Sequence, residues 1–337
     1  MRLSAFALTW RGRGGLPAFV PDGIETCSRP MAARPLRSLW RRLDYPPIEY
    51  WTGPVDVVHG TNFVVPPSRR AARIVTVHDL TAVHYPELCT ADTLRYPSLI
   101  RRAVAAGAWV HTPSAFVARE VVEQFQIGQD RVRAIAHGVP GAARLATGDA
   151  ASGRRLAGSG HFVLALGAIE PRKGLPLLVR AFDLVADADH EINLVVAGPD
   201  AWGSDALTAA IEASPNRRRI RRLGYVGADE KAALLAAAAV FAYPSLYEGF
   251  GLPPLEAMTV GVPVVATTAG ALPEVLGDAA VLVPPGDMEA LAGGLAELLQ
   301  DGGGRAARVE EGRRRASAYS WGRCADGMLD LYTLAGS

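Results

Sequence analysis

The chain has 337 residues, of which 49% are hydrophobic and 20% are charged, and its formal net charge is +1. This composition excludes a disordered chain and a collagen-like repeat, and the length exceeds what one hydrophobic core usually supports, so we expect two domains. The charge is uneven, because residues 1–150 hold 18 Arg against 12 Asp and Glu, while the remainder holds 17 basic against 22 acidic residues. The first part is therefore the one expected to face an anionic partner.

Cysteine usage and hydropathy indicate a cytoplasmic protein. The three cysteines, Cys27, Cys89 and Cys324, are widely spaced and form no CxxC pair, so neither a disulfide framework nor a structural zinc site is predicted. The opening apolar run is too short for a signal peptide, and the longest apolar stretch, 232–244, is shorter than the roughly 20 residues that span a bilayer. We expect a chain that does not cross a membrane.

In the first part of the chain, short apolar runs alternate with helical patterns. Strands are predicted at 55–59, 74–78 and 110–112, and helices at 93–106 and 115–125, the last with Ser114 as its N-terminal cap. The stretch 138–160 is rich in Gly, Ala and Ser, so we predict the linker there. The expected segments are a first domain at 1–145, a second at 146–320 and a final helix at 321–337.

From residue 162 onward the alternation is more regular. Strands are predicted at 162–166, 193–197, 240–243, 262–266 and 280–283, and helices at 175–186, 206–213, 230–239 and 289–300. Continuous apolar strands separated by helices indicate a parallel sheet covered on both faces. The predicted fold class is α/β, with two Rossmann-like domains and a cleft between them.

The strongest functional signal is the run Glu248-Gly-Phe-Gly-Leu-Pro-Pro-Leu-Glu256, which follows a predicted strand and enters a helix near Pro253. Gly249 and Gly251 allow backbone amides to approach a ligand, and the helix N-terminus favours an anion. Because carboxylates repel a phosphate, the two glutamates that bracket this site are expected to accept hydrogen bonds from hydroxyls, such as a ribose diol and a sugar ring. The alternative is a plain strand–turn–helix junction with Glu256 on a solvated first turn.

A second signal, Gly167-Ala-Ile-Glu-Pro-Arg172-Lys173-Gly174, also lies between a predicted strand and a helix. Ligands of open α/β sheets bind outside the carboxyl ends of the strands. Arg172 offers a planar fork for phosphate oxygens and Lys173 a compact charge. Only two of the 35 basic residues are lysines, which favours a point-charge requirement at Lys173, although Lys231 lies on an ordinary helix with no evident role. The alternative is a solvated basic helix start.

Two histidines end predicted strands in the first domain. His78 and Asp79 follow one strand, and His59 and Gly60 follow another at the same edge of the sheet. A histidine at this edge can exchange hydrogen bonds with a sugar hydroxyl. The alternative for His78 and Asp79 is a satisfied structural pair.

Together these motifs resemble those of the retaining glycosyltransferases of family 4. The resemblance rests on EGFGLPPLEAM, the following GVPVVATTAGALPEVLGDAAVLV, GAIEPRKG upstream and TVHDL earlier, and it covers the chain from about Val55 onward. It implies a GT-B fold, a UDP- or GDP-sugar as donor substrate, no required cofactor or metal, and a hydroxyl-bearing acceptor such as a glycan, a lipid-linked sugar or a small molecule.

The same resemblance assigns roles to residues. Glu256 would bind the ribose, Glu248 the transferred sugar, and Arg172 with Lys173 the diphosphate, while His78 would approach the sugar from the acceptor side. The implied catalytic residues are Glu248, His78, Lys173 and Arg172. The implied donor-binding residues are Arg172, Lys173, Glu248, Gly249, Phe250, Gly251, Leu252, Glu256, Tyr225 and Val226, with His59, Gly60 and Asp79 on the acceptor side.

Two departures from the family pattern stand out. Relatives often carry an arginine directly after the strand-ending glycine, where this chain has Gly167-Ala168, so Arg172 is expected to carry more of the phosphate contact. The chain also opens with Leu3-Ser-Ala-Phe-Ala-Leu, which resembles a second strand, and 12–15 does not resemble the family's glycine-rich loop. We therefore expect an N-terminal domain without its first βα unit. This leaves a nucleotide-sugar-binding pseudoenzyme or partner subunit as an alternative function, with an epimerase as a weaker one.

Three further patterns suggest other ligands. Asp187-Ala-Asp189 is formally a DxD metal signature, but its place in a polar turn predicts no metal site. The basic run 216–222 lacks interleaved aromatic residues, so we predict a solvated edge and no nucleic acid. On a helix, Arg34, Arg37 and Arg41 share one face opposite apolar residues, so peripheral contact with an anionic membrane is an alternative to packing on the domain's own sheet.

Overall fold

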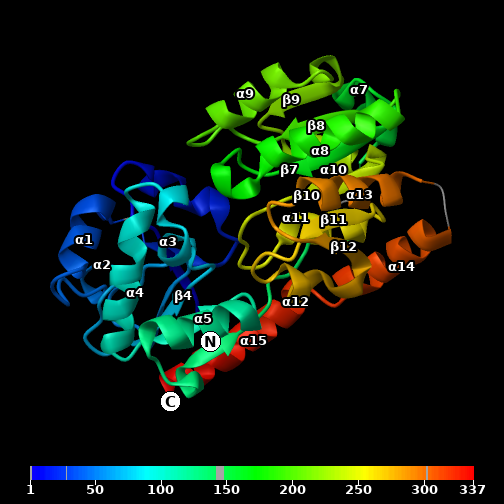
Figure 1. The fold of residues 1–337 in the computed structure, drawn as a ribbon. Coiled ribbons are helices and arrows are strands. Elements are labelled where there is room, and N and C mark those ends of the chain that lie inside the picture. The colour runs from blue at the N-terminus through cyan, green and yellow to red at the C-terminus, as the bar shows by residue number, and fades with distance from the viewer. Residues whose placement is uncertain (1, 28, 142–147, 301–302) are drawn as a thin grey trace. The chain divides into compact units, whose positions relative to one another are not determined.

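A computed structural model describes residues 2–27, 29–141, 148–300 and 303–337. The chain divides into two compact units (Figure 1). Unit 1 comprises 1–112, 118–134 and 328–337, and unit 2 comprises 113–117 and 135–327. The expected boundary at residue 145 lies outside the described residues, whereas the units show that the chain passes between them several times.

Unit 1 is built on a parallel sheet with the order β3-β4-β5-β6. The strands are β3 (Val57–Gly60), β4 (Ala72–Thr76), β5 (Trp109–Thr112) and β6 (Val132–Ala134). The helices are α1 (Ala33–Trp40), α2 (Glu49–Thr52), α3 (Thr81–His84), α4 (Tyr96–Ala105) and, from residue 118 onward, α5 (Ala115–Phe125). As predicted, Ser114 caps α5, since its hydroxyl accepts a hydrogen bond of 3.2 Å from the Val117 amide.

The opening of the chain lies outside that sheet. β1 (Ser4–Phe6) pairs in parallel with β2 (Glu25–Cys27) in a separate two-stranded sheet. The glycines at 12–15 lie in a 3₁₀ helix, Gly12–Phe19, whose side chains are mostly exposed.

A buried polar chain of hydrogen bonds crosses the sheet of unit 1. The two ring nitrogens of His59 lie 2.8 Å from the Tyr332 hydroxyl and 2.7 Å from the Thr76 hydroxyl. The Thr76 hydroxyl in turn lies 2.9 Å from a ring nitrogen of His111. Tyr332 belongs to α15 (Trp321–Gly336), so the last helix of the chain supplies a partner to a strand near its beginning.

Unit 2 contains a six-stranded parallel sheet with the order β12-β11-β10-β7-β8-β9. Its strands are β7 (Phe162–Leu166), β8 (Asn193–Ala197), β9 (Ile220–Gly224), β10 (Val240–Tyr243), β11 (Val264–Thr267) and β12 (Ala280–Val283). On one side of the sheet, the strands follow their sequence order outward from β7 through β8 to β9. On the other side, they follow it outward from β10 through β11 to β12. The order therefore reverses between β7 and β10, and such a switch point is where doubly wound sheets bind ligands.

Helices cover both faces of this sheet, because its strands are apolar on both sides. One core contains residues of α7, α10, α11 and α12, and the other contains residues of α8, α9 and α13, two of which, α8 and α13, pack side by side (Figure 1). The helices are α7 (Ala150–Ala157), α8 (Leu175–Ala188), α9 (Asp205–Ala213), α10 (Ala228–Ala237), α11 (Leu252–Thr259), α12 (Leu272–Leu276), α13 (Met288–Leu299) and α14 (Gly303–Ser317).

The structure corrects the predicted linker and adds an edge strand that the sequence analysis did not predict. Part of the predicted linker is the helix α7, which Asp149 caps by accepting hydrogen bonds from the amides of Ala151 and Ser152. The basic run predicted as a solvated edge contributes the edge strand β9. As predicted, much of the run is solvated, since Arg217, Arg218 and Arg221 are exposed. Arg219 is half-buried, and its guanidinium donates to the carbonyl oxygens of Asp189 at 2.8 Å and Ala186 at 2.7 Å.

Candidate functional site

The two strongest motifs lie on the loops that follow β7 and β10, the strands on either side of the switch point. Arg172 and Lys173 form part of the 3₁₀ turn Pro171–Lys173 between β7 and α8. Glu248 lies in the loop between β10 and α11. The two loops are joined through their backbones, since the Leu246 amide donates to the Arg172 carbonyl over 2.8 Å. The sequence-predicted phosphate and sugar residues are thus brought together at one edge of the sheet.

Glu248 is the centre of a buried ion cluster. Its carboxylate accepts a hydrogen bond of 2.6 Å from Lys173 Nζ on one oxygen and lies 2.9 Å from an Arg172 guanidinium nitrogen on the other. Arg172 also lies 2.7 Å from Glu170 Oε1 and donates to the Tyr247 carbonyl at 2.8 Å. Only 6% of Glu248 is exposed, so its charge depends on these partners. The formal charges of Glu170, Arg172, Lys173 and Glu248 cancel.

The cluster shifts the pKa of Glu248 and that of Lys173 in the direction that keeps each residue charged. Burial alone would raise the pKa of Glu248, but the charges of Lys173 and Arg172 outweigh burial and lower it to about 2. Burial would likewise lower the pKa of Lys173, but the Glu248 carboxylate raises it above its ordinary value. Glu248 is therefore a carboxylate and Lys173 an ammonium at neutral pH, which are the charge states that their predicted roles require.

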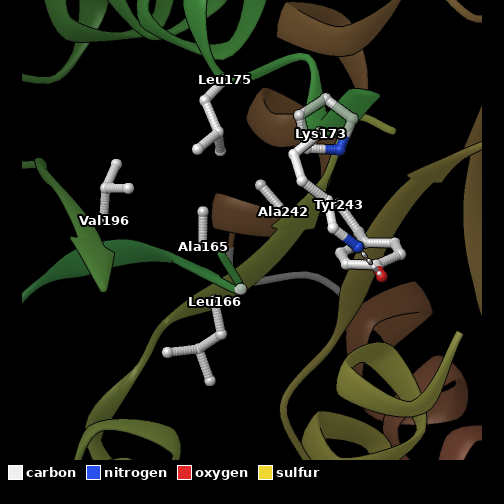
Figure 2. Close-up of a pocket in the computed structure, with 9 residues that line it drawn as sticks. Ala165, Leu166, Lys173, Leu175, Val196, Ala242 and Tyr243 are labelled. Atoms are coloured by element: carbon white, nitrogen blue, oxygen red, sulfur yellow. Dashed lines mark hydrogen bonds between the residues drawn. The ribbon is translucent and has the colours of Figure 1, made fainter. Parts of the chain in front are cut away.

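Tyr243 is a partner of Lys173 that the sequence analysis did not identify. Its hydroxyl accepts a hydrogen bond of 2.8 Å from Lys173 Nζ (Figure 2). Burial, followed by the Glu248 charge, raises the pKa of Tyr243 to about 12. A cavity of about 10 Å³ lies beside this pair and is lined by residues including Leu166, Leu175 and Val196. The lysine is thus held from the sheet side as well as by Glu248.

Glu256 is buried, contrary to the alternative of a solvated first turn. Only 9% of the residue is exposed. Its two carboxylate oxygens accept hydrogen bonds from Lys231 Nζ, over 2.7 Å and 2.9 Å. The prediction that Lys231 has no evident role is therefore wrong: the lysine on α10 is the direct counter-ion of the second motif glutamate.

The N-terminus of α11 carries the other residues of the motif that the sequence analysis predicts to bind the donor. Gly251 has φ +110°, a conformation that side-chain-bearing residues rarely adopt, and Leu252 opens the helix one residue before Pro253. Phe250 is buried, with ring contacts to His137 and Tyr319. The Gly249 carbonyl accepts a hydrogen bond of 2.8 Å from the Ser114 hydroxyl, which fixes the start of the turn.

Gly270 supports Glu248 from the loop after β11. A Cβ atom at Gly270 would lie 2.2 Å from the Glu248 carbonyl oxygen, and Gly270 has φ +62°. The next amide, that of Ala271, donates to the same carbonyl over 2.8 Å. Only glycine allows the two loops to approach this closely, a contact that the sequence signals only as part of the longer family-like run.

Tyr225 and Val226 follow the end of β9 and precede α10. Tyr225 is 76% exposed, so its ring is available to a ligand. Arg222 of the same segment is held by Asp200 and by the Thr208 hydroxyl.

The acceptor-side residues predicted from sequence all belong to unit 1. His78 Nε2 lies 2.9 Å from the Thr61 carbonyl, so this nitrogen is a donor. Asp79 Oδ1 accepts a hydrogen bond of 2.9 Å from the Thr81 amide at the start of α3. Gly60 is buried at the end of β3, and both ring nitrogens of His59 face protein hydroxyls.

The DxD pattern has a structural use. Asp189 Oδ1 accepts hydrogen bonds from the amides of Glu191 and Ile192, at 2.9 and 3.2 Å, and so closes the turn after α8. Across the described ranges, no group of three or more His, Cys, Asp or Glu side chains is arranged to hold a metal ion. In the same part of the chain, no helix is both long and apolar enough to cross a bilayer.

Solved structures with the same arrangement define the fold. The chain is similar to WaaG, a glycosyltransferase involved in lipopolysaccharide biosynthesis, with a TM-score of 0.76 and 18% identity over 99% of this chain and 91% of that one. It is also similar to Anabaena Alr3699/HepE in complex with UDP-glucose, with a TM-score of 0.65 and 20% identity over 77% of this chain and 72% of that one. The fold is that of the GT-B glycosyltransferases, with two Rossmann-like domains, as predicted.

Sequence comparison then defines the family. Residues 153–315 match the family described as glycosyl transferases group 1. The chain is 31% identical over 315 residues to the O-antigen chain mannosyltransferase B of Escherichia coli. The aligned region covers 89% of this chain and 78% of that protein. The chain belongs to the group 1 glycosyltransferases and is an enzyme that transfers a sugar from a nucleotide-sugar donor. Its assignment to family 4 remains a prediction.

Proposed function

We propose that this chain transfers a mannosyl group from a nucleoside diphosphate donor to a hydroxyl of a growing glycan, with retention of anomeric configuration and without a metal ion. The observation that carries the proposal is the buried cluster of Glu248, Arg172 and Lys173 at the switch point, with a second buried carboxylate, Glu256, on the helix that follows. The mannosyl group is supported by the name of the O-antigen relative.

In this proposal the donor lies along the carboxyl edge of the unit 2 sheet. Tyr225 and Val226 frame the base, Glu256 accepts hydrogen bonds from the ribose diol, and Glu248 accepts them from the transferred sugar. Arg172, Lys173 and the amides of Phe250 and Gly251 hold the diphosphate. Because the cluster already has balanced charges, the α11 N-terminus adds the positive potential that a diphosphate needs.

The proposed reaction breaks the bond between the anomeric carbon and the β-phosphate oxygen and forms a bond from the acceptor oxygen to the same face of that carbon. The acceptor proton passes to the departing phosphate oxygen. Lys173 and Arg172 stabilise the negative charge that develops on the leaving diphosphate, which is generally a large contribution to catalysis. We assign His78 and Asp79 of unit 1, with His59 and Gly60, to the acceptor side, as the family resemblance implies.

The experiment that tests the proposal has two stages. Thermal shift with UDP, GDP and their sugars identifies the base and sugar, since a donor that binds the native state stabilises it in proportion to the logarithm of its concentration. The product of the selected donor, formed with EDTA present, is then examined by NMR. An α-linked product from an α-linked donor supports retention without a metal, whereas an inverted product or loss of activity in EDTA contradicts it. Donor binding without transfer to any glycan acceptor would favour a nucleotide-sugar-binding partner subunit instead.

We also propose peripheral contact between unit 1 and anionic lipid. Leu36 and Trp40 of α1 are buried, so the apolar face packs within the protein and cannot insert into a bilayer. The contact is therefore electrostatic. Residues of α1, of the segment 92–95 and of α4 line one pocket. Its charged residues are Arg34, Arg37, Arg41, Asp92 and Arg95. Arg95 pairs with Asp92 at 3.2 Å, which leaves an excess of positive charge.

Vesicle co-sedimentation tests this contact. The wild type should pellet with vesicles that contain phosphatidylglycerol and remain in the supernatant with phosphatidylcholine alone. A variant with Arg34, Arg37 and Arg41 all changed to Gln should lose the binding. Equal sedimentation of the variant and the wild type would contradict the proposal.

A further inference from the structure

Each of the two lysines of the chain contacts one of the two motif glutamates. Among 35 Lys and Arg residues only Lys173 and Lys231 are lysines. Lys173 Nζ lies 2.6 Å from Glu248, and Lys231 Nζ lies 2.7 Å from Glu256. The coincidence is informative because arginine serves in nearly every other position where this chain needs a positive charge.

The contact of Lys231 uses one nitrogen for both oxygens of Glu256, at 2.7 and 2.9 Å. A carboxylate offers about four lone-pair positions, so a single ammonium leaves room for further donors. An arginine fork would instead place two parallel N–H groups along the carboxylate edge and occupy more of them. A lysine is thus the cation that can fix this carboxylate while leaving it able to accept two hydroxyl groups.

The place of Lys231 in the fold also connects it with the proposed donor site. Lys231 lies in the second turn of α10, the helix that directly follows Tyr225 and Val226. Its side chain is 32% exposed, whereas that of Glu256 is 11% exposed, so the more accessible member of the pair is the lysine. One ion pair therefore links the helix that directly follows the proposed base-binding segment with the residue proposed to bind the ribose.

We infer that Lys231 is a positioning residue for donor recognition, which orients Glu256 so that its remaining lone pairs accept the ribose diol. The inference rests on the proposed role of Glu256. In the opposite arrangement, the Lys231 ammonium would occupy the place of the ribose diol on Glu256 in the free enzyme and would compete with the donor. The two relations predict opposite changes in affinity when the ammonium is removed.

The test compares Lys231→Met, Lys231→Arg and Glu256→Gln with the wild type, using calorimetry with UDP, GDP and their 2′-deoxy forms. Arg180→Met is the matched control, because Arg180 is exposed on α8 and its loss changes the net charge equally. The wild type should prefer the ribonucleotide, and Lys231→Met should lower both this preference and the affinity roughly tenfold, the effect of one hydrogen bond to a charged group. Lys231→Arg should restore part of the preference.

Steady-state kinetics separates positioning from loss of structure. For Lys231→Met, KM for the donor should rise about tenfold while kcat stays within about threefold, whereas a damaged fold would lower kcat as well. Tighter nucleotide binding by Lys231→Met, or an unchanged preference for the 2′-hydroxyl, would overturn the inference while the role of Glu256 stands. If Glu256→Gln also keeps the full preference, the proposed role of Glu256 fails together with the inference.

Discussion

At the scale of single residues, the site is defined by charges that are buried together. Moving an isolated carboxylate into a protein interior costs several kcal/mol, and the attraction between well-placed partners offsets that cost. Glu248 has two cationic partners, and the pKa shifts of Glu248 and Lys173 show that both attractions exceed the desolvation penalty. The cluster is consequently sensitive to the loss of any one member, because the remaining charges stay buried.

Lys173→Met should show this sensitivity. The substitution leaves Glu248 with one cationic partner, and the free energy of unfolding should fall by about 3–5 kcal/mol, as for other broken buried pairs. Transfer activity should fall at least about a hundredfold, because the contact proposed between Lys173 and the leaving diphosphate is also lost. Urea denaturation and initial rates with the preferred donor measure the two effects.

Tyr243→Phe is the matched comparison. It removes the hydroxyl that accepts from Lys173 but keeps the charges, so the unfolding free energy should fall by only about 1 kcal/mol and the activity should change by less than about tenfold. A larger fall in the unfolding free energy for Tyr243→Phe than for Lys173→Met would contradict the view that charge compensation stabilises the cluster.

At the scale of elements, the strand–helix alternation of unit 2 could be predicted from the sequence, because its strands are buried on both faces and each helix buries one apolar face. Four of the five predicted strands there coincide with β7, β8, β10 and β12, and the fifth, β11, begins two residues later than predicted. The helix α7 was missed because Gly, Ala and Ser resemble a linker in composition. Its signals were the cap Asp149 and Gly158, which ends the helix in a left-handed conformation.

Part of the site could be predicted from the sequence for the same reason, and part could not. Glu248, Arg172 and Lys173 follow two strands that a doubly wound sheet places side by side, so their proximity follows from topology. The contacts of Lys231, Tyr243 and Gly270 depend instead on how helices and loops pack. Nothing in the local sequence of α10 distinguishes a lysine that reaches Glu256 from one in solvent.

Gly270→Ala tests the loop contact that holds Glu248. The new Cβ would lie 2.2 Å from the Glu248 carbonyl and would also require a left-handed backbone conformation. We expect the unfolding free energy to fall by about 2–3 kcal/mol and donor affinity to weaken.

Gly293→Ala in α13 is the control, because a Cβ there would meet nothing within 4 Å. That variant should be more stable than the wild type by about 0.5–1 kcal/mol, since alanine favours a helix interior. Thermal denaturation of both variants checks the opposite signs. If both substitutions changed the stability equally, the close contact with the Glu248 carbonyl would not restrict residue 270 to glycine.

At the scale of the whole molecule, the two units respond differently to acid. In unit 1, burial and the neighbouring His111 and His78 lower the pKa of His59 to about 3. The unfolded chain binds this proton near pH 6.5, so the unfolded state gains protons first as the pH falls, and stability decreases below that pH. In unit 2, the pKa of Glu248 falls from its ordinary value of 4.5 to about 2, so its contribution to stability is full above about pH 4.5 and is lost progressively as the pH falls toward 2.

His59 alone should therefore lower the stability of unit 1 by about 2 kcal/mol at pH 5 relative to pH 8. Hydrogen exchange of the β3 and β4 amides at the two pH values measures the loss. His59→Gln should reduce this difference by the same amount. A pH dependence that is unchanged in the variant would show that His59 is protonated in the native state.

The division of α15 between the units has a consequence for synthesis. Unit 1 includes residues 328–337, and one of them, Tyr332, hydrogen-bonds to His59. Although most of unit 1 is translated first, its last segment emerges only after all of unit 2 has been made. At common translation rates this delay after residue 134 is roughly 10–40 s. The hydrogen bond between Tyr332 and His59 can therefore form only after all of unit 2 has been synthesised, so unit 1 should be the last of the two to complete its fold.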